Sequence, residues 1–188
     1  MKFAVFGNSG SGKSTLARWI AKNIHAQVLD LDTVVWEAGK VAVPRAEEAA
    51  LEDVADFCKS SDRWVVEGCY SNMVEATFCF APTLVFLKPG LEQCVNNCLS
   101  RPWETHKYSS KVEQDQHLAF LLNWVKDYYS RDGVMSLVGH EATFGRYSGR
   151  KFEISEQLSF DPASSVLVEI VSKGGSSGRA EGSPCSAA

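Results

Sequence analysis

The sequence predicts an α/β fold built on a parallel sheet, and three observations lead to this prediction. Five short apolar runs alternate along the chain with segments whose apolar residues repeat at helical spacing. Such alternation is typical of parallel strands joined by right-handed helical crossovers. The first apolar run, residues 3–6, leads directly into a glycine-rich loop that opens a helix. At 188 residues the chain is long enough to bury the core of one such domain.

Strands and helices are expected in alternation from the first residues onward. Residues 13–24 are predicted to form the first helix because Leu16, Ile20 and Ile24 fall on one face. The predicted strands are residues 3–6, 28–32, 64–67, 83–87 and 151–155. The predicted helices are residues 13–24, 44–59, 91–101, 112–131 and 161–172.

The expected domain covers residues 1–172. Within it, the polar segment 101–112 joins two predicted helices and is expected to act as a lid. Asp161 followed by Pro162 is typical of an N-cap and first helical position, so this pair is expected to open the last helix. Residues 173–188 are rich in Gly, Ser, Ala and Pro without periodicity, which predicts a disordered tail.

Charge and hydropathy argue against several classes of protein. The formal net charge of −4 argues against a nucleic-acid binder that relies on bulk positive charge. It does not exclude a local basic groove. No apolar run approaches the length needed to cross a bilayer, so no membrane association is expected. A single Lys2 precedes the first strand, which is unlike a signal peptide. We therefore expect a cytoplasmic protein whose oligomeric state the sequence leaves open.

The glycine-rich loop carries the most specific motif of the chain. Residues 7–15 read G-N-S-G-S-G-K-S-T between a strand and a helix, which is the P-loop pattern. Its glycines allow successive backbone N–H groups to point inward toward phosphate oxygens, beside the positive end of the helix dipole. Lys13 is expected to reach the β- and γ-phosphates, and Ser14 to bind Mg²⁺. The motif predicts binding of ATP and Mg²⁺ by Gly7, Asn8, Ser9, Gly10, Ser11, Gly12, Lys13, Ser14 and Thr15.

Acidic residues end the second and third predicted strands. Asp30 and Asp32 alternate along a strand end, so both are expected to face the same side. One is expected to hold Mg²⁺ through water, and the other to accept a proton or a hydrogen bond from a substrate hydroxyl. Glu67 follows an apolar run, where many P-loop proteins place an acidic residue. We assign Ser14, Asp30 and Glu67 to the metal and Asp32 to the acceptor, with a merely polar strand end as the alternative.

Phosphoryl transfer also needs positive charge around the moving group. Arg101 begins a stretch that also carries His106, Lys107 and Lys111, and Arg101 is the candidate for the transferred phosphate. The alternative is a solvated loop between helices. Arg131, at the end of the predicted long helix, is a second candidate, unless it only complements the dipole of that helix.

Three further residues are candidates for holding the acceptor. Trp36 and Tyr70 are expected to flank the acceptor crevice and to stack on a ring, with ordinary packing as the alternative. Arg45 opens the second predicted helix, where it either binds an anionic acceptor or is a surface arginine. Trp124 is assigned to the core, and residues 139–150 receive no interpretation.

Taken together, three segments resemble the small P-loop kinases with an adenylate-kinase-like or shikimate-kinase-like fold. Residues 7–18 read G-N-S-G-S-G-K-S-T-L-A-R, residues 31–39 fit L-D-x-x-x-W-x-x-G, and residues 64–70 fit W-V-x-[DE]-G-x-Y. The likeness covers residues 1–101 and is strongest to short bacterial-type proteins labelled adenylate-kinase-like or topology-modulation proteins. The pair at 101–102 also resembles the R-P at the lid of shikimate-kinase-like enzymes.

The resemblance implies a three-layer P-loop NTPase fold whose five parallel strands are ordered 2-3-1-4-5. It also implies Mg²⁺, a lid arginine that matches Arg101, and transfer of the γ-phosphoryl group of ATP to an acceptor. Three functions stay open. The first is a kinase for a hydroxyl or phosphate of a small molecule, with Lys13, Asp32 and Arg101 as catalytic residues. The second is a nucleoside or nucleoside monophosphate kinase, with the aromatic candidates and Arg45 holding the base and phosphate. The third is a nucleotide-dependent switch with little turnover.

Overall fold

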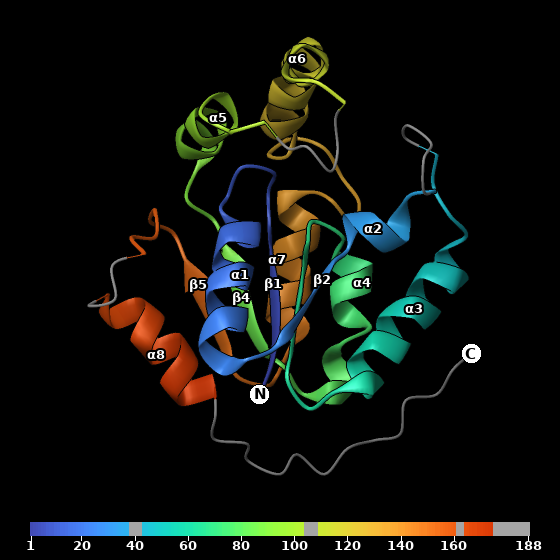
Figure 1. Ribbon diagram of the computed structural model, residues 1–188, viewed down its shortest axis with the longest axis vertical. Helices are drawn as coiled ribbons and strands as arrows, with labels where there is room; N and C mark the ends of the chain where they lie inside the picture. The colour runs from blue at the N-terminus through green and yellow to red at the C-terminus, as the bar shows by residue number, and fades with distance from the viewer. Residues whose placement is uncertain (38–42, 104–108, 161–163, 175–188) are drawn as a thin grey trace.

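Five parallel strands form one sheet at the centre of the molecule (Figure 1). A computed structural model describes residues 1–37, 43–103, 109–160 and 164–174. The strands are β1 (Lys2–Gly7), β2 (Gln27–Asp30), β3 (Trp64–Gly68), β4 (Thr83–Leu87) and β5 (Lys151–Ile154). Their order in the sheet is β2-β3-β1-β4-β5, and every neighbouring pair is parallel. The α/β class and the strand order implied by the resemblance are therefore confirmed.

Helices cover both faces of this sheet and complete the three layers (Figure 1). One face is covered by α1 (Lys13–Ile24) and α8 (Ser165–Gly174). The other face is covered by α3 (Glu47–Ser60), α4 (Ser71–Glu75) and α7 (Leu137–Arg146). The remaining described helices are α2 (Asp32–Val35), the 3₁₀ helix η1 (Phe78–Phe80), α5 (Leu91–Leu99) and α6 (Lys111–Asp127).

The two faces of the central strand β1 belong to two separate cores. Ala4 and Phe6 pack toward α3, α4 and α7, whereas Phe3 and Val5 pack toward α1 and α8. All four side chains are fully buried. Because successive side chains of a strand point to opposite faces, a strand covered on both sides must be apolar throughout. This explains the continuous apolar run that precedes the P-loop.

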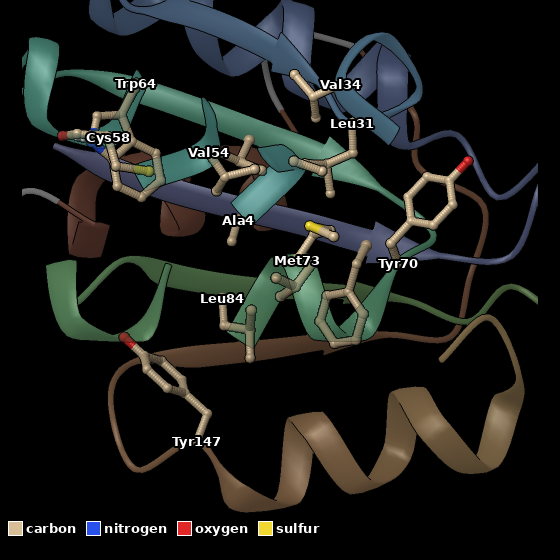
Figure 2. Packing of buried hydrophobic residues seen from close by; sticks show 14 of the residues in the cluster. Ala4, Leu31, Val34, Val54, Cys58, Trp64, Tyr70, Met73, Leu84 and Tyr147 are labelled. Atoms are coloured by element: carbon tan, nitrogen blue, oxygen red, sulfur yellow. Dashed lines mark hydrogen bonds between the residues drawn. The ribbon is translucent and has the colours of Figure 1, made fainter. Parts of the chain in front are cut away.

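The larger core lies between the sheet and the helices α3, α4 and α7 (Figure 2). Trp64 lies beside Cys58 at the end of this core away from Tyr70, and its Nε1 donates to the Cys58 carbonyl at 3.0 Å. Tyr70 stands at its margin, and Figure 2 shows the hydroxyl directed away from the other labelled side chains. The core therefore positions the body of Tyr70 while leaving its polar tip to the carboxyl edge of the sheet.

Helices α5 and α6 stand beyond the carboxyl edge of the sheet, and we call them the α5–α6 pair (Figure 1). Their cluster of buried side chains contains Cys94, Cys98 and Val125. Leu121 and Leu122, which the helical period marks as an apolar face, are only half-buried here. The periodicity therefore correctly indicates a helix. This helix packs against α5 and lines a cavity instead of packing on the sheet.

Several predicted boundaries differ from the structure. The second strand ends at Asp30 instead of residue 32, because Asp30 Oδ1 accepts the Asp32 backbone N–H at 3.0 Å and turns the chain into α2. The long helix ends at Asp127, where the Arg131 N–H donates back to the Asp127 carbonyl at 2.8 Å in a turn. The last helix runs from Ser165 to Gly174, so Lys173 belongs to it. The expected cap at Asp161 and Pro162 and residues 175–188 of the expected tail lie outside the described residues.

The helix α7 runs from Leu137 to Arg146, so it overlaps the segment 139–150 for which the sequence predicts no structure. Ser136 caps it, because the Ser136 Oγ accepts the Gly139 N–H at 3.0 Å. Gly139 and Gly145 lower the helical propensity of this segment, which hides the pattern in the sequence. Packing of Phe144 against the larger core compensates for that weak propensity.

Candidate active site

The P-loop joins β1 to α1 and adopts a conformation that two of its glycines make possible. Gly10 has φ +77° and Gly12 has φ +95°, both in the left-handed region that favours glycine. A Cβ atom on Gly10 would also lie 2.3 Å from the Cys94 carbonyl oxygen of α5. The loop is therefore seated against the α5–α6 pair as well as against the sheet.

Polar groups of the P-loop leave room for phosphate oxygens. Lys13 Nζ donates to the Asn8 carbonyl at 2.9 Å, so its ammonium group is folded over the loop. Ser11 Oγ is buried and has no hydrogen-bond partner among the residues that the structure describes. Ser14 and Thr15 open α1 with exposed side chains. A phosphate group would supply the missing partner of Ser11 and meet the positive end of α1, so these residues fit a nucleotide phosphate.

Asp30 and Glu67 lie side by side at the carboxyl edge of the sheet. They are register partners in the β2–β3 pair, and Glu67 is only 4% exposed. Burial raises the pKa of the Glu67 carboxyl, with Asp30 and Asp32 adding to the shift and Lys13 and a hydrogen bond with Ser14 opposing it. A cation placed between Ser14 and these acids would relieve their mutual repulsion.

The donor set fits Mg²⁺ bound together with phosphate better than a metal held by protein alone. Within the described ranges no group of three His, Cys, Asp or Glu side chains is arranged to hold a metal ion. Mg²⁺ is usually bound by one or two protein oxygens, several waters and the oxygens of a phosphate substrate. The Ser14 hydroxyl and the carboxylates of Asp30 and Glu67 provide such a partial set, so they fit this ion.

Asp32, Tyr70 and Trp36 form a chain of hydrogen bonds. The Tyr70 hydroxyl donates to Asp32 Oδ1 at 2.7 Å, and the Trp36 Nε1 donates to the Tyr70 hydroxyl oxygen at 2.7 Å. Tyr70 is 5% exposed, and burial raises its pKa, with Cys69 and Asp32 adding to the shift. Tyr70 therefore remains a neutral donor that holds the Asp32 carboxylate, in addition to lining the crevice as expected.

The three candidate arginines lie in different surroundings. Arg101 is half-buried and lines the cavity, with its Nη2 3.9 Å from Cys98 Sγ. Arg45 Nη1 pairs with Asp53 Oδ2 at 2.6 Å and donates to the Val34 carbonyl, and Arg45 does not line the cavity. Arg131 lies beyond α6 instead of at its end. Its guanidinium lies 3.5 Å from the centre of the Trp124 ring.

Other parts of the expected lid are placed only in part. Lys111 opens α6 and pairs with Asp115 at 2.5 Å. His106 and Lys107 lie outside the described residues. A role of the segment 101–112 as a lid stays a prediction.

One cavity of about 880 Å³ connects the P-loop with most of these side chains. Asp32, Trp36 and Tyr70 follow β2 and β3, which lie on one side of β1, so they line the cavity on that side of the P-loop. Leu158 and Phe160 follow β5 and line it on the other side. The remaining wall comes from the α5–α6 pair and the residues next to it. A ligand in the P-loop would therefore have space on both sides.

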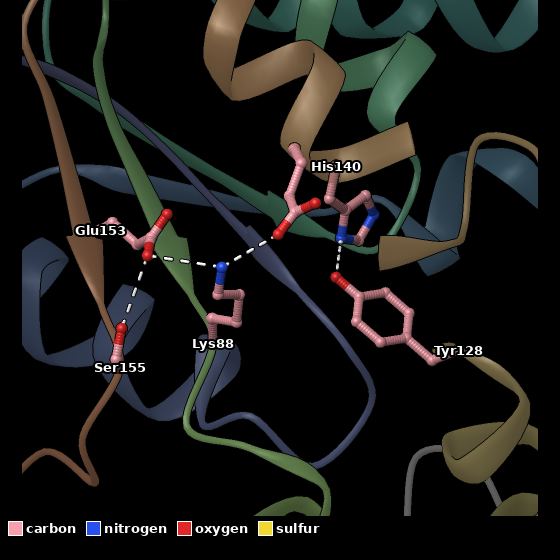
Figure 3. Close-up of polar contacts among 6 residues, drawn as sticks. Lys88, Tyr128, His140, Glu153 and Ser155 are labelled. Carbon is pink, nitrogen blue, oxygen red and sulfur yellow. Dashed lines mark hydrogen bonds and ion pairs between the residues drawn. The ribbon is translucent and has the colours of Figure 1, made fainter. Parts of the chain in front are cut away.

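Several residues of the site were not expected from the sequence. Trp124, assigned to the core, lines the cavity, and Asn97 of α5 donates to the Gly10 carbonyl at 2.8 Å. His140, for which the sequence offered no partner, is fully buried and contacts the Tyr128 hydroxyl at 2.8 Å (Figure 3). Its other ring nitrogen lies 2.9 Å from the carbonyl of Cys69, a residue that lines the cavity. Trp124 of α6 and Asn97 of α5 gave no such signal, because the P-loop with which they line the cavity lies far away in the sequence.

Comparisons with known proteins give a fold and no family. No family model matches the sequence, and no curated protein matches it. The chain is similar to a sugar kinase from Janibacter sp. HTCC2649, with 10% identity and a TM-score of 0.50 over 92% of this chain and 90% of that one. It is also similar to an uncharacterized protein from Eubacterium ventriosum ATCC 27560, with 14% identity and a TM-score of 0.49 over 92% and 98% of the two chains.

A third similar structure is the shikimate kinase from Bacteroides thetaiotaomicron. It shares 14% identity at a TM-score of 0.48, over 92% of this chain and 95% of that one. At 10% identity, the likeness to the sugar kinase supports a common fold and does not transfer an activity. The adenylate-kinase-like and topology-modulation parts of the resemblance stay predictions.

The helices can be compared with the length that a membrane span requires. Among the residues that the structure describes, no helix combines the length and the apolar character needed to cross a membrane.

Proposed function

We propose that this chain is a phosphotransferase that moves the γ-phosphoryl group of ATP to a hydroxyl of a small-molecule acceptor. One observation carries the proposal: a single cavity joins the P-loop to the Asp32 carboxylate, which Tyr70 holds in place. The P-loop supports binding of the triphosphate, and the space beside Asp32 supports binding of a second molecule.

The arrangement of the side chains in the cavity supports the following roles. Asp32 accepts the proton of the acceptor hydroxyl as its oxygen bonds to the γ-phosphorus. The bond from that phosphorus to the β,γ-bridging oxygen breaks, and ADP leaves with the electron pair. Lys13 and Arg101, which both line the cavity, stabilise the negative charge on the moving group. Ser14 with Asp30 or Glu67 would hold Mg²⁺, which neutralises phosphate charge when it is bound.

Substitution of Lys13 and Asp32 tests this proposal with the purified full chain. Lys13→Ala should lower ADP release from Mg-ATP at least about a hundredfold, because it removes the cation from the phosphates. Asp32→Asn should abolish the stimulation of ADP release by an acceptor while leaving binding of a fluorescent ATP analogue unchanged. Unimpaired turnover by Lys13→Ala would overturn the proposal.

The other two functions are separated by the same assay. A nucleoside monophosphate kinase needs a cation for the acceptor phosphate, and Arg45 is occupied by Asp53 and the Val34 carbonyl. A nucleotide-dependent switch predicts tight ATP binding with slow ADP release that no small molecule accelerates. The space beside Asp32 favours an enzyme over a switch.

A further inference from the structure

Aromatic rings line a large part of the cavity. They are Trp36, Tyr70, Trp103, Phe120 and Trp124. Phe120 is 72% exposed and Trp103 is 45% exposed, although both line a concave site. Large apolar side chains that face water in a cavity usually mark a surface for a ligand. The acceptor half of the proposed reaction therefore has ring faces available to it.

Trp124 is held rigidly against the cavity by Arg131. The guanidinium of Arg131 lies 3.5 Å from the centre of the indole ring, so it covers one face of that ring. Arg131 is fixed in turn, because Nη1 donates to the Trp124 carbonyl at 2.9 Å and Nε donates to the Met135 carbonyl at 2.8 Å. Since Trp124 still lines the cavity, the surface that it presents there is the part not covered by Arg131.

Trp36 is held beside the acceptor carboxylate. Its Nε1 donates to the Tyr70 hydroxyl oxygen, and the same hydroxyl donates to Asp32 Oδ1. The ring centres of Trp36 and Tyr70 are 6.5 Å apart in an edge-to-face arrangement. One hydrogen-bond chain therefore fixes both the indole of Trp36 and the carboxylate that would receive a proton.

The charges on the side of the P-loop where β2 and β3 end disfavour an anionic acceptor. Asp30, Asp32 and Glu67 line the cavity there. Within the described residues, the arginines and lysines that line it are Lys13 of the P-loop, Arg18 of α1 and Arg101 after α5. These three acids would repel a carboxylate or phosphate on the acceptor, while Lys13 and Arg101 are assigned to the phosphates of ATP, so an anionic acceptor would cost free energy.

From these observations we propose that the acceptor is an uncharged alcohol attached to a flat aromatic or heteroaromatic ring. The ring lies against Trp36 and Trp124, and the hydroxyl lies at Asp32. This inference rests on the proposed phosphotransferase function. Stacking on rigid rings supplies binding free energy without charge, which suits a wall that contains several rings beside a cluster of acids.

A panel of acceptors tests the proposal, with ADP release from Mg-ATP as the readout. The panel contains neutral nucleosides and hydroxymethyl-substituted pyridines, polyols and sugar acids without an aromatic ring, and nucleoside monophosphates. We expect a ring alcohol to stimulate ADP release at least about tenfold, and the other two groups to stimulate it weakly. Stimulation by a polyol, a sugar acid or a monophosphate in place of ring alcohols would overturn this inference while leaving the phosphotransferase intact. A flat panel would overturn both.

Substitution of the two indoles provides a second, independent readout. Trp36→Leu and Trp124→Leu should each raise the KM of the ring alcohol about tenfold, with little change in the KM of ATP. Trp124→Phe should restore most of the loss because it keeps a ring face. Trp19→Leu is the matched control. Trp19 packs against the core between the sheet and the helices α1 and α8, and it does not line the cavity. Equal effects of Trp19→Leu and Trp124→Leu, or no effect of either cavity substitution, would contradict the proposal.

Discussion

The sheet with its covering helices and the α5–α6 pair both line the cavity, but the sheet region buries many more apolar side chains than the α5–α6 pair does. Each face of the sheet has its own extensive core, and strands such as β1 are buried throughout. The α5–α6 pair has a cluster of only Cys94, Cys98 and Val125 among the described buried side chains. In α6, Gln114 and Val125 are the buried residues, and Phe120 is largely exposed. Regions with few buried apolar contacts open at lower free energy than a core.

This difference in packing divides the residues that line the cavity into two groups. The P-loop follows β1, Asp32 opens α2 after β2, and Glu67 lies within β3 of the well-packed sheet. Trp124 and Phe120, by contrast, lie on α6. With the exception of Arg101, which follows α5, the groups that the proposed phosphoryl transfer would need therefore belong to the better-packed region. The proposed acceptor wall combines Trp36 and Tyr70, which pack against the larger core, with Phe120 and Trp124, which lie on the less well-packed helix α6.

The largest expected effect comes from truncating one apolar side chain in each of the two regions. Phe86→Ala removes a fully buried ring of β4 and should lower the free energy of unfolding by about 3–5 kcal/mol. Leu122→Ala, in the half-buried cluster of α6, should lower it by about 1 kcal/mol. Urea denaturation followed by circular dichroism measures both values. If Leu122→Ala destabilises the chain as much as Phe86→Ala, the two regions are equally well packed and the comparison is wrong.

The next effect concerns His140, which links the residues after α6 to the sheet. The Cys69 carbonyl can only accept, so the Nε2 of His140 carries the hydrogen and its Nδ1 accepts from Tyr128. Burial lowers the pKa of His140 from 6.5 to about 4. Between these values the unfolded chain binds the proton and the folded chain does not, so stability falls as the pH falls from 6.5 to about 4. The loss should be on the order of 3 kcal/mol.

Urea denaturation at several values of pH from 7 to 4 measures this loss. His140→Gln should remove most of the slope, because glutamine can donate to Cys69 and accept from Tyr128 without titrating. His117→Gln is the control, since His117 is exposed on α6. A slope that survives in His140→Gln would show that another group carries the pH dependence.

Tyr70→Phe should separate activity from stability at the border of the better-packed region. The substitution keeps the ring in the core and removes the hydroxyl that donates to Asp32 and accepts from Trp36. We expect kcat/KM for the acceptor to fall about 10- to 100-fold, since hydrogen bonds to charged groups contribute about 1.5–3 kcal/mol. The melting temperature should fall by only several degrees, because the ring stays in the core. An unchanged kcat/KM would mean that Asp32 needs no such support.

The smallest effect is expected where the two regions meet through α5. Asn97→Ala removes the hydrogen bond from the Asn97 side chain to the Gly10 carbonyl. It should weaken binding of a fluorescent ATP analogue by a few fold, because one partly buried hydrogen bond contributes about 1 kcal/mol. Asn23→Ala, on an exposed part of α1, serves as the control. Stronger binding by Asn97→Ala would show that α5 restrains the loop in an unfavourable conformation.

Short-range patterns of the chain predicted the fold well. The strand, P-loop and first helix are contiguous in sequence, and residues 13–24 form a helix with the expected bounds. The strands at 64–68 and 83–87 also lie where apolar runs predicted them. The order of the strands came from the family resemblance, because alternation alone does not determine which strands are neighbours.

Long-range contacts explain what the sequence did not reveal. The hydrogen bond of Tyr70 to Asp32 joins residues 38 positions apart, and that of Asn8 to Val125 joins residues 117 positions apart. Trp124 has the helical spacing of a core residue, and nothing nearby in the sequence shows that its helix stands beyond the sheet. The helix α7 was missed because its stability comes from packing of residues such as Phe144 on the larger core instead of from local propensity.

Asn8 connects the P-loop to α6, so it would link α6 to the nucleotide that we propose binds in the loop. Its Oδ1 accepts the Ser9 N–H at 2.8 Å, while its Nδ2 donates to the Val125 carbonyl at 2.9 Å. A phosphate that draws the Ser9 amide toward itself competes with Oδ1 and so acts on the same side chain that holds α6. Thermodynamic reciprocity then requires that the free energy by which the nucleotide changes the docking of α6 equals the free energy by which docking changes nucleotide affinity. If the proposed nucleotide binds, this one amide would make the occupancy of the loop and the position of the helix a coupled pair of variables.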